Sequence, residues 1–172
     1  MAETPVPRSR ADERLLEDVA TYGWHVAIVP PEEDSPGWAY SVGFLSTFGH
    51  PEVVVFGLPP EDAHALVNDV GDRIRNGVPV QEGAAIGDLV PGRICAVRGV
   101  ARRWKSTLLE GALWFHGRED VPILQILRAD AEGRLPGDAG FAETLAEAQP
   151  LLHRESPEEA RLERVLATFE DL

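Results

Sequence analysis

The densest run of apolar positions in this chain, WAYSVGFLSTFGHPEVVVFGL, begins at residue 38. Its first part, residues 38–45, is apolar, aromatic and small, and its last part, residues 53–58, is rich in β-branched side chains, so both parts predict strands. Gly and Pro between them predict a turn. His50 and Glu52 stand in this turn, which makes the stretch the first candidate for a functional site.

The same periodicities predict the other elements. Helices are predicted where apolar residues recur every three or four positions after a capping residue or proline, at residues 9–22, 60–75, 106–116 and 156–170. Further strands are predicted at residues 24–29, 94–104 and 121–127, a loop or irregular edge strand at 78–92, and a turn-rich loop at 130–140. Because strands do not alternate strictly with helices, we expect an α+β fold with a largely antiparallel, twisted or barrel-like β-sheet and about three to four flanking helices.

Length indicates how these elements are organised. A chain of 172 residues fits one domain. Residues 1–8 contain two prolines and nothing to pack, so they are predicted to be a disordered lead, and residues 9–172 are predicted to be a single α+β domain. The capping box of Ser156 and Glu159 starts the amphipathic helix over 156–170, which is expected to dock on the rest.

Charge narrows the classes of partner. Hydrophobic residues make up 44% and charged residues 26%, as in an ordinary globular protein, and the net charge is −13. Nucleic acid is not expected as a partner, because binding phosphates requires clustered Lys and Arg. The most basic stretch, Arg98 to Lys105, is interpreted first as a charged strand edge and second as an anion site.

Cysteine and hydropathy patterns suggest the compartment. Cys95 is the sole cysteine and lies in an apolar run, so it is predicted to be a buried, inert thiol. The start of the chain lacks the apolar core of a secretory signal, and no run of about 18 apolar residues occurs. We therefore expect a cytoplasmic protein that does not enter a membrane.

The His-Pro-Glu turn has two interpretations. Pro51 disfavours helical geometry for the residue before it, and in an extended segment His50 and Glu52 share one face. A carboxylate beside an imidazole could orient a catalytic histidine, or the two could ligate a metal. In the alternative, Glu52 accepts backbone N–H groups in a turn and His50 packs over it.

The remaining chemistry-bearing residues complete no known signature. Ser41 lies outside the usual serine-nucleophile motifs, the other histidines lack metal-ligand spacing, and the glycines form no phosphate loop. No metal site is therefore predicted. Gln125 interrupts an apolar strand and must either tie two elements together or line a pocket, and Tyr40 poses the same choice between core packing and ligand stacking.

Several segments together resemble a known family. They are YGW at 22–24, AYSVGF at 39–44, GHPEVVVFGL at 49–58, ILQ at 123–125, the turn of Asp130 and Gly133, and QPLL at 149–152. Over residues 15–152 the chain resembles the bacterial domain-of-unknown-function family DUF4262, and the resemblance implies no particular activity. The motif positions that it carries over are Tyr40, Ser41, Gly43, His50, Pro51, Glu52 and Gln125.

The chain departs from the family pattern at two places. Leu135, Pro136 and Gly137 stand where the family tends to have a bulkier Pro-Trp motif, and Ser41 stands where threonine is usual. If the 130–140 loop closes over a ligand, this member is expected to bind differently. The order of strand, turn, strand and helix also looks like the opening of flavin-reductase-type split barrels, an analogy that implies a flavin without identifying a phosphate site.

The sequence therefore leads to one main hypothesis and two rivals. The first is a module that binds a small molecule or a protein partner in a pocket around the His-Pro-Glu turn, with Tyr40, Ser41, His50, Glu52 and Gln125 as candidate ligand-binding residues. The rivals are a flavin-dependent oxidoreductase and a hydrolase or metal enzyme that uses His50 and Glu52, so whether the protein is an enzyme stays open. Self-association into a homodimer is expected if the sheet has an edge to shield.

Overall fold

The computed structural model of the chain describes residues 4–170, and for residues 144, 145 and 170 it describes the backbone alone. Six strands form one sheet in the order β1-β2-β3-β6-β5-β4. The strands are β1 (His25–Val29), β2 (Trp38–Val42), β3 (Glu52–Phe56), β4 (Ala85–Val90), β5 (Arg93–Gly99) and β6 (Ile123–Arg128). All neighbouring strands are antiparallel except β3 and β6. The structure confirms a largely antiparallel α+β fold, with an open sheet rather than a barrel-like one.

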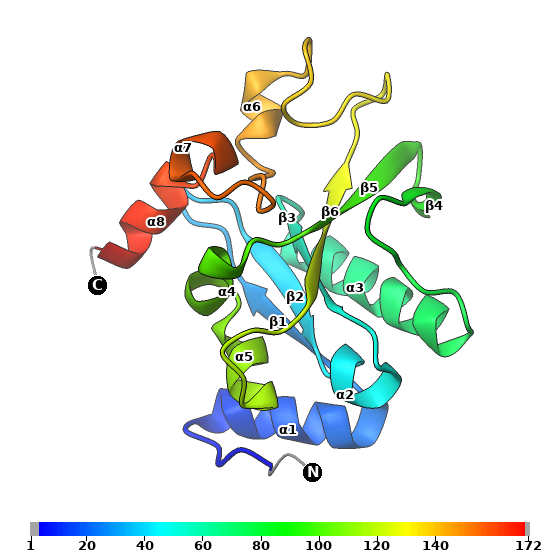
Figure 1. Cartoon of the computed structure of the whole chain (residues 1–172), viewed down its shortest axis with the longest axis vertical. Helices are drawn as coiled ribbons and strands as arrows, with labels where there is room; N and C mark the ends of the chain where they lie inside the picture. Colours follow the sequence, from blue (N-terminus) through cyan, green and yellow to red (C-terminus); the bar gives the residue numbers. More distant parts are fainter. Residues whose placement is uncertain (1–3, 171–172) are drawn as a thin grey trace.

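Helices cover both faces of this sheet (Figure 1). They are α1 (Arg10–Tyr22), α2 (Phe44–Phe48), α3 (Pro60–Arg75), α4 (Arg102–Leu108), α5 (Glu110–His116), α6 (Glu143–Ala146), α7 (Pro157–Ala160) and α8 (Glu163–Glu170). The long helix α3 packs on one face, and α4, α5 and residues of the C-terminal helices pack on the other. The described helices outnumber the three to four expected because several are of one or two turns.

The central strand β3 illustrates why both faces need cover. Alternate side chains of a strand point to opposite faces. Val53 and Val55 lie in the apolar cluster under α3, and Val54 and Phe56 lie in the cluster under α4 and α5. All five residues of β3 are buried, which explains its continuous apolar sequence.

The predicted strand over residues 38–45 is too long, because the chain turns into a helix at Phe44. β2 ends at Val42, and Gly43 adopts a φ of 122° that L side chains rarely adopt. A Cβ on Gly43 would also lie 2.7 Å from the carbonyl oxygen of Gly23. The short helix α2 therefore replaces the end of the expected strand and the start of the expected turn.

The predicted strand over 94–104 is also too long. β5 ends at Gly99, and α4 begins at Arg102. Trp104 and Leu108 are buried one helical turn apart, and the indole of Trp104 donates to the carbonyl oxygen of Arg154. Ser106 thus lies inside α4 instead of starting the helix expected over residues 106–116, whereas α5 ends at residue 116 as expected, with Gly117 in a left-handed conformation.

The C-terminal segment forms two helices where one was expected. Ser156 caps α7 by accepting from the backbone N–H of Glu159, as the capping box predicts. The backbone then breaks at Arg161, whose φ is 61°. The carbonyl oxygen of Ala160, which a continuous helix would need, accepts instead from the backbone N–H of Leu151. Tertiary hydrogen bonding therefore ends α7 after one turn.

Gln125 ties the centre of the sheet to the segment that leads to these helices. It is fully buried in β6. Its Nε2 donates to the carbonyl oxygen of Pro150 at 2.6 Å, and its Oε1 accepts from the backbone N–H of Leu152 at 3.0 Å. Of the two roles expected for this amide, the structure shows the tie between elements.

We predict that Gln125→Ala lowers the free energy of unfolding by about 2–3 kcal/mol, because it leaves a buried carbonyl and a buried N–H without partners. Urea denaturation measures this change. Gln81→Ala, the same substitution at an exposed position, is the control and is expected to change little. Equal effects of the two substitutions would contradict the structural role of Gln125.

Candidate functional site

Glu52 is the last residue of the His-Pro-Glu turn, and its carboxylate has no exposed surface. Glu52 is the first residue of β3, and its side chain shares the face of Val54 and Phe56, toward α5. Its Oε1 accepts from the Ser41 hydroxyl at 2.8 Å and from the backbone N–H of Phe44 at 2.9 Å. Its Oε2 accepts from the backbone N–H of Gly43 at 2.8 Å and lies 2.7 Å from His116 Nε2. Every donor that a buried carboxylate needs is thus present.

These contacts make Glu52 the cap of α2. Gly43 precedes the first helical residue and has no side chain with which to cap the helix. The carboxylate supplies that function from a neighbouring strand by accepting the N–H groups of Gly43 and Phe44. Glycine is needed at position 43 for its backbone conformation, so the cap has to come from elsewhere in the chain.

Ser41 belongs to the same buried group. Its hydroxyl donates to Glu52 and accepts from the backbone N–H of Val53 at 2.9 Å. In a catalytic triad the imidazole stands between the nucleophile and the carboxylate. Here the carboxylate stands between the hydroxyl and the imidazole, and Ser41 is fully buried. This order suits an anchor between elements better than a nucleophile.

His116 is the imidazole partner of Glu52, and sequence reasoning missed it. It closes α5, and its side chain is 7% exposed. A histidine at a helix C-terminus is a common feature that predicts no particular partner. The residue lies 64 positions from Glu52 along the chain, so no local spacing could have paired the two.

His50 takes different partners from those expected. Its Nδ1 lies 2.7 Å from the carbonyl oxygen of Pro51, and its Nε2 accepts from the backbone N–H of Val80 at 3.0 Å. Both bonds form in the neutral tautomer that carries its proton on Nδ1. The imidazole and the carboxylate of the His-Pro-Glu turn therefore do not form the pair that a shared face predicted. As in the alternative interpretation, Glu52 accepts backbone N–H groups.

Tyr40 positions α5 and, with it, His116. The phenol oxygen accepts from the backbone N–H of Gly111 at 3.1 Å. A Cβ on Gly111 would lie 2.7 Å from that oxygen, so glycine allows the helix to approach. Burial raises the pKa of Tyr40 to about 12. Tyr40 and Gln125 are thus structural ties, and the structure brings only Ser41 and Glu52 of the candidate residues into one group.

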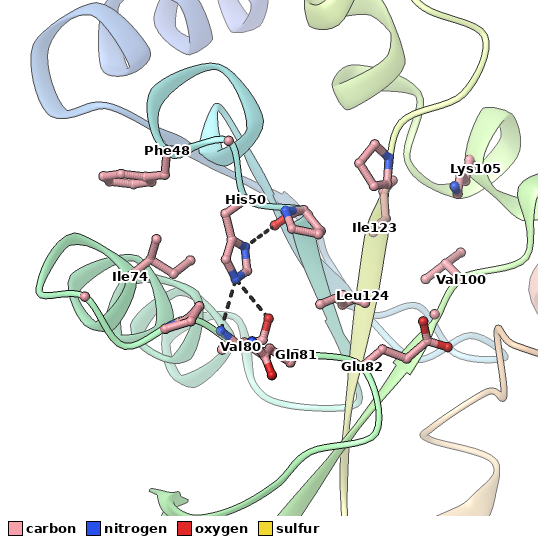
Figure 2. Close-up of a pocket in the computed structure, with 16 residues that line it drawn as sticks. Phe48, His50, Ile74, Val80, Gln81, Glu82, Val100, Lys105, Ile123 and Leu124 are labelled. Atoms are coloured by element: carbon pink, nitrogen blue, oxygen red, sulfur yellow. Dashed lines mark hydrogen bonds between the residues drawn. The ribbon is translucent and has the colours of Figure 1, made fainter.

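A pocket of about 810 Å³ opens beside the His-Pro-Glu turn, and we call it the turn pocket (Figure 2). Figure 2 shows Phe48 and Ile74 on one side of His50 and Val100 and Lys105 across the hollow. Its lining consists of Phe48, Gly49, His50, Pro51, Ile74, Gly77, Pro79, Val80, Gln81, Glu82, Gly99, Val100, Lys105, Pro122, Ile123 and Leu124. His50 is the one candidate ligand-binding residue in that lining.

Few charged groups face the turn pocket. Lys105 is 6% exposed, and its Nζ donates to Asp120 at 2.6 Å. This hydrogen bond lowers the pKa of the Asp120 carboxyl below its usual value. Glu82 adds a carboxylate near Gly99. The pocket therefore offers mainly apolar walls, with a cation that already has a partner.

Comparison with known proteins identifies one similarity. A family model described as Domain of unknown function (DUF4262) matches residues 18–142, which confirms the resemblance seen in the motifs. No curated protein and no solved structure matches the chain. Within residues 4–170, no group of three or more His, Cys, Asp and Glu side chains is arranged to hold a metal ion. No helix in that range is both long and apolar enough to cross a membrane.

We predict that Glu52→Gln destabilises the protein by about 3–5 kcal/mol, because an amide cannot accept from all the donors that surround this position. Urea denaturation measures the change. Glu119→Gln is the matched control, since Glu119 forms an exposed pair with Arg102 at 3.5 Å and should contribute little. A small effect of Glu52→Gln would contradict its role as an anchor.

We predict that the buried phenol makes stability fall at alkaline pH. Between the usual pKa of 10.0 and the raised value of about 12, the unfolded chain loses the phenol proton while the folded chain keeps it. Tyr40→Phe should therefore remove about 2–3 kcal/mol of the stability loss across this range. Urea denaturation as a function of pH tests this, with the exposed Tyr22→Phe as a control that should lose stability as wild type does.

Proposed function

This chain belongs to the family Domain of unknown function (DUF4262), and from the geometry of its own site we propose that it is a binding module that holds a small, largely apolar ligand in the turn pocket. The observation that carries the proposal is the pocket itself. Its volume of about 810 Å³ lies within the usual range for small-molecule sites. Of the two occupants considered from sequence, a small molecule fits a concave pocket better than a protein surface does.

The walls of the turn pocket are held in place without a ligand, which supports binding. His50 joins the turn before β3 to the segment after α3 through Pro51 and Val80. The strand ends at Gly99 and Ile123 form the opposite wall. A pocket formed in advance loses less conformational entropy on binding than one that must be ordered.

The arrangement of the buried acid gives less support to the hydrolase hypothesis. Ser41 and Glu52 are fully buried and do not line the turn pocket. A nucleophile or general base must reach the substrate to act on it. His50 does reach the pocket, but both its ring nitrogens have protein partners. Binding without turnover therefore accounts for more of the geometry.

The flavin hypothesis also receives less support at this pocket. A flavin phosphate would need several free donors. Lys105 already donates to Asp120, and Glu82 would repel a phosphate. The polarity of the lining favours a ligand that is neutral where it meets these walls.

We predict that N-phenyl-1-naphthylamine, a neutral apolar fluorophore, binds wild-type protein with a rise in fluorescence. Gly99→Leu should weaken this binding at least about tenfold, because a Cβ on Gly99 points toward Glu82, 3.1 Å from its Oε1, and both residues line the turn pocket. Gly87→Leu is the matched control, since a Cβ at that position on β4 meets nothing within 4 Å. Absence of binding, or equal binding by wild type and Gly99→Leu, would contradict the proposal.

Native mass spectrometry of protein from its own host would then identify the ligand. Wild type and Gly87→Leu should carry the same small molecule, and Gly99→Leu should lack it. A flavin adduct that survives in Gly99→Leu would favour the oxidoreductase and place its cofactor elsewhere.

A further inference from the structure

A second pocket lies at the other end of β6, and nothing in the proposed function uses it. The turn pocket is lined by Ile123 at the start of this strand, whereas the second pocket is lined by Arg128 at its end. At about 3.3 Å per residue the two lie about 17 Å apart along β6. In Figure 1 the yellow arrowhead of β6 points upward, toward the loop that leads to α6. The pocket measures about 530 Å³, and we call it the arginine pocket.

Arg128 is a partly buried cation without an acidic partner. Its Nη1 donates to the carbonyl oxygen of Phe56 at 2.8 Å. Across the residues that the structure describes, Nε and Nη2 make no hydrogen bond and the guanidinium forms no ion pair. Burial lowers its pKa. A cation withdrawn from water without a counter-charge is costly, so its retention calls for an explanation.

The backbone of Arg128 is held firmly. Gln149, itself buried, accepts from the backbone N–H of Arg128 at 2.8 Å and donates to its carbonyl oxygen at 3.0 Å. Together with the bond to Phe56, these contacts hold the residue in place at the pocket. A fixed donor set of this kind is favourable for binding, because less freedom is lost when the ligand arrives.

The acids that share the arginine pocket are occupied by other groups. Asp130 accepts from Arg134 Nε at 2.8 Å and from the backbone N–H groups of Glu132 and Arg134. Glu132 accepts from the same guanidinium through Nη2. Arg134 therefore serves these two carboxylates and leaves Arg128 unpaired. Arg93 also lines the pocket and is exposed, and its guanidinium forms no hydrogen bond or ion pair with the described part of the chain.

We infer that the arginine pocket binds the carboxylate or phosphate group of a small organic anion, with Arg128 as the buried donor and Arg93 as the exposed one. A guanidinium presents parallel N–H groups that match two oxygens of either anion. Leu58, Val90 and Phe141 in the lining provide apolar contact for the organic part. In a chain of net charge −13, two unpaired arginines in one hollow set this place apart from the acidic remainder.

Isothermal titration calorimetry at constant ionic strength tests this inference with three probes of similar size: phenyl phosphate, benzoate and neutral benzamide. At least one anion should bind about tenfold more tightly than benzamide. The better of the two anions identifies the group that the pocket selects. Equal binding of all three probes, or no binding of either anion, would overturn the inference.

Variants locate the binding. Arg128→Met keeps an unbranched side chain without the charge and should weaken anion binding at least about tenfold, and Arg93→Gln should weaken it several-fold. Arg14→Gln, at an exposed position on α1, is the control and should bind as wild type does. If Arg128→Met does not fold, Arg93→Gln and the comparison with benzamide decide the outcome. Unchanged affinity in the folded arginine variants would place the anion elsewhere and refute the assignment.

Discussion

A carboxylate with no contact with solvent joins three parts of this fold. The side chain of Glu52 receives the hydroxyl of Ser41 from β2, the free N–H groups at the start of α2, and the imidazole of His116 from α5. Burying such a group is unfavourable unless donors surround it. Because the donors come from separate elements, the carboxylate is satisfied only when all of them are in place. The interaction therefore couples the local turn to the packing of α5 on the sheet.

The two pockets share a strand but differ in chemistry. At the start of β6 the walls are mainly apolar, and the buried Lys105 already has Asp120 as its partner. At the end of β6 the guanidinium of Arg128 has a carbonyl partner and, among the residues that the structure describes, no acidic one. The strand is central in the sheet and buried on both faces, so it gives each pocket a rigid wall. The neutral ligand proposed for the turn pocket and the anion proposed for the arginine pocket would therefore not compete for one site.

The His-Pro-Glu turn illustrates how far local patterns reach. Both of its polar side chains are buried, since His50 and Glu52 are 6% and 0% exposed. The two residues do not pair as expected, because each forms a hydrogen bond with a segment that is distant in the chain. Val80 lies 30 residues from His50, and His116 lies 64 residues from Glu52. A motif of three residues contains no information about either partner.

The sequence by itself determined the α+β class, the mostly antiparallel sheet, the long helix α3 and the family, because these depend on periodicity and on local motifs. It also determined that Gln125 needed partners, since an amide in an apolar strand must be satisfied. Tertiary structure alone decided that β2 ends at Val42 and β5 at Gly99, that the C-terminal helix breaks at Arg161, and which groups meet Glu52. The reason is physical: these features depend on hydrogen bonds and close approaches between segments that are far apart in the chain, and no local pattern records them.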